Sequence, residues 1–305
     1  MRRKIGFIGL GMMGLPMLEN LATAPDLQIL AFDTAAAPFA TLASHAAWGD
    51  TLHRADTLAE LAECAIVITM LPNSPITNLV IAGDAHHRGL VDILAGGATI
   101  VDMGSSNPGD TRKLADTLAA RGIALVDAPV SGAVAKARAG TLAIMAGGDP
   151  AHVAAVRPLL EYMGDTLIET GAVGSAHAMK ALNNYVYAAG LLAASEAMLI
   201  AQRMDLNAEI FARVLNASSG RNVATETKLT QFIIPRTFNA GFALRLQAKD
   251  LATAAGLQTL ADVEAPQLTL CATLWKQAIE TLDPRADNTE IIRYLESMQD
   301  SAAVS

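Results

Sequence analysis

A glycine-rich turn near the start of the chain constrains the fold more than any other stretch. Residues 4–8 form a short apolar run typical of a buried strand, and Gly9, Gly11 and Gly14 follow with the spacing G-x-G-x-x-G. The first glycine permits the sharp turn, the second lets a diphosphate approach the backbone, and the third lets helix and strand pack closely. Glycines also serve ordinary tight turns. The pattern predicts a strand, a phosphate-binding turn and a helix whose dipole favours an anion.

An acidic residue strengthens this interpretation. A second apolar run, 28–32, ends at Asp33, which lies 19 residues after Gly14. A carboxylate at this position accepts hydrogen bonds from the ribose hydroxyls of a bound dinucleotide, and it repels a 2′-phosphate. None of residues 34–38 is basic, and Arg54 is the one cation that we expect to offset the repulsion if the fold brings it over the ribose. The sequence therefore predicts NAD in preference to NADP.

The composition indicates a globular protein that does not bind nucleic acid or a membrane. Hydrophobic residues make up 52% of the 305 residues, charged residues 17%, and the net charge is −8. The two cysteines lie far apart without metal-ligand spacing, so we expect buried thiols, a reducing cytoplasmic location and no metal site. The basic residues 2–4 precede too short an apolar run for a signal peptide. The apolar segment 185–201 contains Glu196 and is expected to be a buried helix, with Glu196 a buried structural carboxylate or an interface contact.

The order of the apolar runs predicts two domains. Helical stretches alternate with the expected strands, which indicates a parallel, doubly wound sheet. Beyond Gly171 almost nothing is strand-like, and helices are expected at about 175–204, 207–216, 222–234, 242–261, 264–281 and 287–298. The predicted fold is an α/β Rossmann-type domain over 1–168 followed by an all-helical domain over 169–305. The expected strands are 4–9, 28–32, 65–70, 98–102, 123–127, 141–146 and 166–169.

Polar residues and glycines follow three of these strands, at 70–73, 102–106 and 127–132. Ligands bind outside the carboxyl ends of the strands in open α/β sheets, so these segments are expected to line one rim. Ser131 and the N–H groups after it can hold a carboxylate, although an ordinary loop would have the same composition.

Two lysines are candidates for chemistry. Lys180 and Asn184 stand four residues apart and share a helix face. A lysine in an otherwise apolar helix is costly to bury, and a buried lysine is a usable proton donor or acceptor; a solvent-facing lysine beside an asparagine is the alternative. From spacing alone, Lys249-Asp250 is expected to be a solvated ion pair.

Taken together, these stretches closely resemble the β-hydroxyacid dehydrogenase family, which includes 3-hydroxyisobutyrate dehydrogenase and tartronate semialdehyde reductase. The resemblance spans about 4–255 and rests on residues 6–17, on 127–132 with 140–142, on 174–184 and on 249–251. It implies that Lys180 is the general acid/base and that Asn184 positions the substrate. Substrate would contact Ser131, Gly132, Ala133 and Lys249. The nicotinamide cofactor would contact Gly9, Leu10, Gly11, Met12, Met13, Gly14, Asp33, Met70, Leu71, Pro72, Ser105 and Lys249.

The expected reaction is therefore hydride transfer between NAD and a small 3-hydroxy acid, first of all 3-hydroxyisobutyrate, with tartronate semialdehyde as the alternative. Lys180 disfavours imine reduction on the same architecture, and the intact pair with Asn184 disfavours a non-catalytic dinucleotide-binding protein. The chain is too short for the larger helical domain of 6-phosphogluconate dehydrogenase. The resemblance also implies a homodimer or homotetramer. Ala133 and Lys136 stand where the family usually has glycine, which bears on the identity of the substrate.

Overall fold

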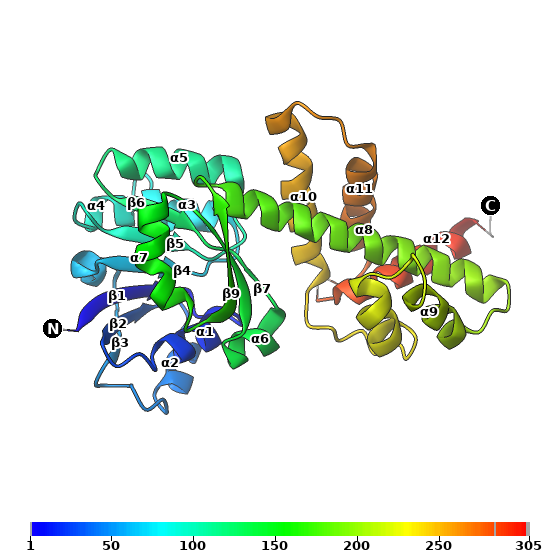
Figure 1. Cartoon of the computed structure of the whole chain (residues 1–305), viewed down its shortest axis with the longest axis horizontal. Helices are drawn as coiled ribbons and strands as arrows, with labels where there is room; N and C mark the ends of the chain where they lie inside the picture. Colours follow the sequence, from blue (N-terminus) through cyan, green and yellow to red (C-terminus); the bar gives the residue numbers. More distant parts are fainter. Residues whose placement is uncertain (1, 284, 303–305) are drawn as a thin grey trace. The chain divides into compact units, whose positions relative to one another are not determined.

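A mixed β-sheet forms the first part of the chain (Figure 1). The computed structural model describes residues 2–283 and 285–302, and within these residues the sheet has nine strands. Six parallel strands run in the order β3-β2-β1-β4-β5-β6, the strand order of a doubly wound dinucleotide-binding sheet. The strands are β1 (Arg3–Ile8), β2 (Leu27–Phe32), β3 (Leu52–Arg54), β4 (Ile66–Thr69), β5 (Thr99–Asp102), β6 (Ala124–Asp127), β7 (Val130–Ser131), β8 (Leu142–Gly147) and β9 (Gly164–Gly171).

Helices cover both faces of this sheet, which confirms the predicted α/β fold. Alternate strand residues enter two separate cores: Phe7 packs with α1, α2 and α7, whereas Ile8 packs with α3, α4 and α5. Burial on both faces explains why the central strands β4 and β5 are mostly apolar. The helices are α1 (Gly14–Leu21), α2 (Ala37–Leu42), η1 (Leu58–Glu63), α3 (Ser74–Ala82), α4 (Leu90–Ile93), α5 (Pro108–Ala119), α6 (Ala133–Ala139) and α7 (Pro150–Leu160).

The prediction of a wholly parallel sheet is wrong after β6. Strand β8 runs antiparallel to β6 and β7, and β9 pairs with β8 in parallel. The chain returns through α6, a helix of seven residues, so that Val130 pairs with Ile144 and Ser131 with Ala143. A parallel connection needs a crossover of a dozen or more residues, and this segment is shorter.

The second part of the chain is helical, as predicted. Its core surrounds Trp275, which is fully buried. The helices are α8 (Ser175–Arg203), α9 (Ala208–Asn216), η2 (Ala224–Ile233), α10 (Leu244–Ala261), α11 (Pro266–Thr281), η3 (Asn288–Glu290) and α12 (Ile291–Ala302). Helix η2 has π-helical hydrogen bonding, and the hydroxyls of Thr227 and Thr230 bond to carbonyls four residues earlier, where they compete with the helical ladder.

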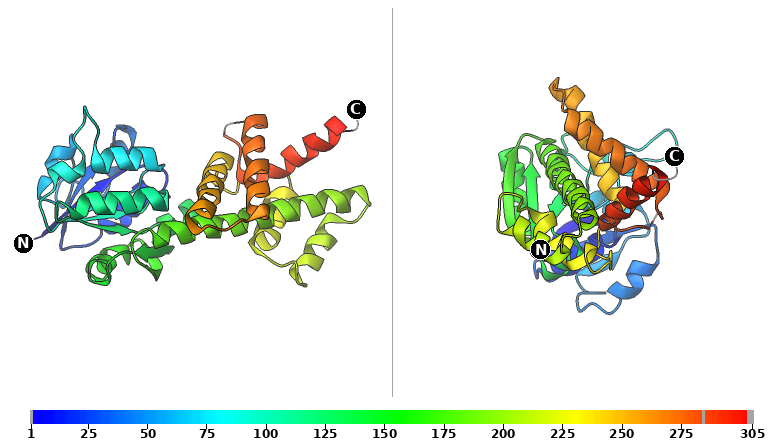
Figure 2. Two further views of the ribbon diagram at one scale, coloured as in Figure 1. Left: turned by 90° about the horizontal axis from the view of Figure 1, so that it is seen from above. Right: turned by 90° about the vertical axis from the view of Figure 1, so that its right-hand side faces the viewer.

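Helix α8 passes from the first compact unit, which ends at Lys180, into the second, which begins at Ala181 (Figure 2). The sequence analysis placed the domain boundary at 168/169. Helix α8 is long and apolar enough to cross a membrane, and 44% of its most apolar window is buried inside the structure. A core helix passes the same test, and Leu191 and Met198 are fully buried in the helical core. Glu196 is exposed, so its prediction as a buried structural carboxylate is wrong.

Candidate active site

In the turn after β1, the fold requires glycine at Gly9 and Gly14 but not at Gly11. A Cβ atom on Gly9 would lie 2.4 Å from the carbonyl oxygen of Met70, and one on Gly14 would lie 1.9 Å from the oxygen of Gly9. Gly11 is exposed, and nothing lies within 4 Å of the position that its Cβ would take. The turn therefore leaves open space beside Gly11, as a cradle for a diphosphate requires.

Asp33 ties the end of β2 to this turn. Its Oδ2 accepts a hydrogen bond of 2.6 Å from the N–H of Leu10, and its Oδ1 accepts one of 2.7 Å from the N–H of Ala35. Each carboxylate oxygen has a second lone pair that can accept a further bond from a ligand. The carboxylate thus stands where the sequence predicts the ribose, and it also shapes the turn.

Arg54, the cation expected to offset Asp33, is held by other groups. It lies on β3 opposite Ala31 of β2. Its Nε is 2.8 Å from the Oδ1 of Asp56, and its guanidinium lies 4.7 Å from the centre of the Phe39 ring. Asp56 offsets part of its charge in an ion pair that is exposed to solvent.

The remaining cofactor candidates follow the neighbouring strands. Met70, Leu71 and Pro72 come directly after β4, and Ser105 comes after β5. The two loops approach closely, because a Cβ atom on Gly104 would lie 2.8 Å from the oxygen of Leu71. The structure therefore places these segments at adjoining carboxyl ends of β1, β4 and β5, the edge where open α/β sheets bind ligands.

The segment after β6 contains a strained residue. Gly132 has φ +143° and Ala133 has φ +57°, so an alanine occupies the left-handed region that favours glycine. Such a conformation costs a non-glycine residue about 1–2 kcal/mol. The stem of Lys136 covers Gly132, since a Cβ atom there would lie 2.6 Å from the Cδ of Lys136. The two departures from the family pattern thus both lie in α6, directly after Ser131 and Gly132.

In the helical unit, a buried hydrogen-bonded group surrounds Asn184. Its Nδ2 donates to Oδ2 of Asp250 at 2.5 Å, and Gln247 donates to its backbone oxygen at 3.1 Å. The other oxygen of Asp250 lies 3.1 Å from Nζ of Lys249. Asp250 is only 3% exposed, so the expectation of a solvated Lys249-Asp250 pair is wrong. Asp250 faces the core side of α10, where it meets α8 rather than water.

Lys180 stands one helical turn before Asn184 on α8, and its side chain is half-buried. The i, i+4 spacing puts both side chains on one face of the helix. Asp250 holds the amide nitrogen of Asn184, and the amide oxygen accepts a hydrogen bond of 3.2 Å from Nδ2 of Asn183. The second lone pair of that oxygen can accept a further bond from a ligand hydroxyl.

Comparison with known proteins identifies the family. The model of the NAD binding domain of 6-phosphogluconate dehydrogenase matches residues 4–173, and the model described as NAD-binding of NADP-dependent 3-hydroxyisobutyrate dehydrogenase matches residues 174–295. The chain is 33% identical over 295 residues to 2-(hydroxymethyl)glutarate dehydrogenase of Eubacterium barkeri. The aligned residues make up 97% of this chain and 95% of that protein. The chain belongs to the β-hydroxyacid dehydrogenase family.

Two further members of this family are similar over nearly their whole length. The 2-hydroxy-3-oxopropionate reductase of Escherichia coli K12 is 31% identical over 297 residues, 97% of this chain and 98% of that one. The structure of Mycobacterium tuberculosis 3-hydroxyisobutyrate dehydrogenase with L-serine superposes with a TM-score of 0.86 at 28% identity, over 97% of this chain and 99% of that one. The resemblance stated from sequence motifs is thereby confirmed, and the family is one of dehydrogenases with nicotinamide-nucleotide-binding domains.

The sequence predicts Asp102 and Asp127 as part of the ligand-binding rim and assigns no role to His177, but all three side chains are buried. Asp102 and Asp127 end β5 and β6, and His177 lies in the first turn of α8. The sequence feature that indicates these residues is an aspartate at the end of each of two otherwise apolar strand runs.

The two cysteines are buried and unreactive. Burial raises the pKa of both Cys64 and Cys271 to about 11, so neither thiol is a nucleophile near neutral pH. Among the residues that the structure describes, no cluster of histidine, cysteine, aspartate or glutamate has the composition of a metal site.

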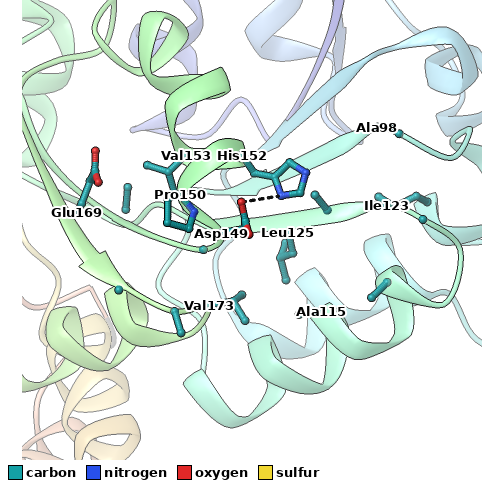
Figure 3. A pocket seen from close by; sticks show the side chains of 18 residues that line it. Ala98, Ala115, Ile123, Leu125, Asp149, Pro150, His152, Val153, Glu169 and Val173 are labelled. Atoms are coloured by element: carbon teal, nitrogen blue, oxygen red, sulfur yellow. Dashed lines mark ion pairs between the residues drawn. The ribbon is translucent and has the colours of Figure 1, made fainter.

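A pocket of about 770 Å³ also opens beside β6, away from the candidate residues (Figure 3). Its lining includes Ala98 and Ile123, which precede β5 and β6, so it lies at the amino ends of these strands. Asp149 on its wall is 3.9 Å from Nδ1 of His152, and Glu169 is paired with Arg157. The pocket belongs to the opposite edge of the sheet from the glycine turn.

Proposed function

We propose that this dehydrogenase transfers hydride between NAD and the β-carbon of a short 3-hydroxy acid, with 3-hydroxyisobutyrate as its substrate. The observation that carries the proposal is the pair of Lys180, a half-buried amine, and Asn184, an amide that Asp250 holds in place. An amine beside an ordered amide is suited to move one proton at a hydroxyl oxygen. The alternative substrate is 2-hydroxy-3-oxopropionate, favoured by the Escherichia coli relative.

The residues around the glycine turn fit a nicotinamide dinucleotide. Gly11 leaves the turn open, and Asp33 stands at the end of β2 with acceptor capacity left for ribose hydroxyls. Residues 9–14, Asp33 and Ser105 of the first unit would hold the cofactor, and the family resemblance adds Lys249. When bound, it supplies the hydride chemistry, and the protein supplies orientation and electrostatics.

The chain's own residues perform the proton transfer. In oxidation, Nζ of Lys180 accepts the proton of the substrate hydroxyl, and in reduction it returns a proton to the same oxygen. Asn184 orients that hydroxyl through its amide oxygen. The hydroxyl of Ser131 and the N–H groups of Gly132 and Ala133 bind the substrate carboxylate.

We propose NAD as the preferred cofactor, by at least about tenfold in kcat/KM, because one unfavourable contact of roughly 1.4 kcal/mol is sufficient. A 2′-phosphate beside Asp33 would meet a like charge. The paired state of Arg54 supports this preference, because its guanidinium already has Asp56 as a counterion.

A panel of substrates tests the proposed function. Initial rates, followed by cofactor absorbance, are measured for 3-hydroxyisobutyrate, 2-(hydroxymethyl)glutarate, L-serine and, in the reductive direction, 2-hydroxy-3-oxopropionate. We expect the highest kcat/KM with 3-hydroxyisobutyrate. A higher value with 2-hydroxy-3-oxopropionate would favour the alternative substrate, and no turnover of any of them would contradict the reaction class.

We further propose that Lys136 favours substrates with an additional anionic or polar group. The exposed amine extends from a stem that covers Gly132, beside the segment that binds the carboxylate. Lys136→Met keeps the stem and removes the charge, and Arg138→Met, on the same short helix, is the matched control. An unchanged ranking of the glutarate against the monocarboxylates in Lys136→Met would show that Lys136 is solvated surface.

We also propose a homo-oligomer in a reducing, cytoplasmic environment. Large apolar side chains are exposed on one side of α8, at Leu182, Val186 and Ile200, and Val186 is 69% exposed. Such a stripe suits contact with a second copy of the chain. Val186→Glu is expected to lower the molar mass measured by light scattering, and an unchanged mass would place the contact elsewhere. The free, buried cysteines support the reducing environment.

A further inference from the structure

A buried polar network joins the ends of β5 and β6 to the first turn of α8. Asp102 and Asp127 close the two strands, and His177 lies three residues before Lys180. Asp127 is fully buried, His177 is 1% exposed and Asp102 is 2% exposed. Nothing in the proposed chemistry requires three buried ionisable side chains at this place, and buried charges are retained only where they are paired or hydrogen-bonded.

Asp127 caps helix α8 from a neighbouring strand. Its Oδ1 accepts the N–H of Gly174 at 2.7 Å, and its Oδ2 accepts the N–H of His177 at 2.9 Å. The first N–H groups of a helix have no partner within the helix, and an anion there is stabilised by the helix dipole. Ser175 begins the helix, but its hydroxyl bonds to Thr170 instead. The direction of the first turn of α8 is therefore set by a carboxylate of β6.

The imidazole of His177 fixes the same turn from its other side. The hydroxyl of Thr111 donates to the oxygen of Asn107 at 3.0 Å, so it accepts from Nδ1–H of His177 at 2.8 Å. Within the residues that the structure describes, Nε2 of His177 has no hydrogen-bond partner, and it lies 3.7 Å from Oδ2 of Asp102. The ring is thus joined to α5 and lies between two buried carboxylates.

Asp102 in turn orders the loop that holds Ser105. It accepts hydrogen bonds from the hydroxyl of Thr69 at 3.1 Å, from the N–H of Gly104 at 3.0 Å and from the hydroxyl of Ser106 at 2.6 Å. The network therefore connects the loop after β5 with the start of the helix that carries Lys180.

We propose that Asp127, His177 and Thr111 are positioning residues that orient the first turn of α8 and hence Lys180; this rests on the proton-transfer role proposed for Lys180. They do not touch the reacting atoms. Their removal tilts the amine relative to the substrate oxygen, so it lowers kcat while cofactor affinity stays unchanged. A misplacement of about 1 Å is sufficient to lower a rate by about 100-fold.

Three substitutions test the proposal in the full-length enzyme. Asp127→Asn keeps the size but turns one acceptor into a donor that faces an N–H group, and we expect kcat to fall by about 10- to 100-fold. Thr111→Val removes the acceptor for His177 without a change of volume and is expected to lower kcat, whereas Thr111→Ser retains the acceptor and is expected to restore it. Ser175→Ala is the matched control, because it removes one hydrogen bond from the same turn without touching the network.

The readout is kcat together with the dissociation constant of the cofactor, measured by fluorescence titration. A merely structural role would lower the melting temperature and weaken both equally. The proposal is overturned if Thr111→Val keeps parental kcat while Lys180→Ala is inactive, and this result decides the matter even where Asp127→Asn fails to fold. If Lys180→Ala itself keeps near-normal kcat, the proposed function fails instead.

Discussion

A substitution at Gly11 distinguishes a glycine that the fold requires from one that a bound ligand requires. Nothing lies within 4 Å of its missing Cβ, and its φ is outside the left-handed region. Gly11→Ala therefore introduces no clash and reduces the freedom of the unfolded chain, which is expected to stabilise the protein by about 0.4–1 kcal/mol. For a unit of this size that corresponds to a rise in melting temperature of up to about 4 °C.

The same methyl group occupies the space that a diphosphate needs. Loss of one hydrogen bond from the turn to a charged oxygen costs about 1.5–3 kcal/mol. The cofactor dissociation constant is then expected to rise by about 10- to 100-fold. Fluorescence titration with NAD and NADP, paired with thermal unfolding of the same samples, measures both quantities.

Gly14→Ala provides the contrast, because its Cβ would lie 1.9 Å from the backbone oxygen of Gly9. We expect this variant to lose about 3 kcal/mol or more of folding free energy, since the backbone has to move. Parental cofactor affinity in a stable Gly11→Ala variant would refute the placement of the diphosphate at this turn.

Four further outcomes are expected. Lys180→Ala keeps cofactor affinity but lowers kcat by about 10²- to 10⁴-fold, and near-normal turnover would remove it from the mechanism. Asp33→Asn lowers the ratio of kcat/KM with NAD to kcat/KM with NADP, as measured from initial rates with both cofactors. Equal use of NADP by the parental enzyme would show that the interpretation of Asp33 is wrong. Ala133→Gly relieves left-handed strain and raises the melting temperature by about 1–4 °C, whereas an unchanged or lower value would contradict the strain. Cys64 and Cys271 resist alkylation at pH 8 in the folded protein, and because burial raises their pKa from 9.0 to about 11, folding stability falls as pH rises through that interval.

The parts of the fold that rest on long apolar runs were predictable. Strands β4 and β5 are buried at every residue, and such burial produces an apolar run that is visible in the sequence without tertiary information. Strands β3 and β7 are too short to carry a pattern. The direction of β8 depends on the length of the connection through α6, which composition does not reveal.

The candidate site likewise contains residues that the sequence predicts and residues whose contacts it does not reveal. The glycine turn and Asp33 are local motifs, so the sequence predicts them. The sequence does not distinguish a buried pair of adjacent charges, such as Lys249-Asp250, from an exposed one. Here the carboxylate of Asp250 is buried against Asn184, which lies 66 residues away in the chain. The cap that Asp127 places on α8 likewise joins residues about 50 positions apart, beyond the reach of any capping pattern within the helix.

The carboxylate of Asp33 has a consequence for the divergence of cofactor use. In the proposed preference for NAD, one side chain both disfavours a 2′-phosphate and, through Leu10 and Ala35, holds the turn in shape. A single replacement by arginine or alanine would remove the repulsion but also two backbone hydrogen bonds, so such a replacement loosens the turn. Serine or asparagine keeps an acceptor at that place without the charge. The route between the two cofactors therefore runs through small polar residues at position 33, with a cation acquired afterwards.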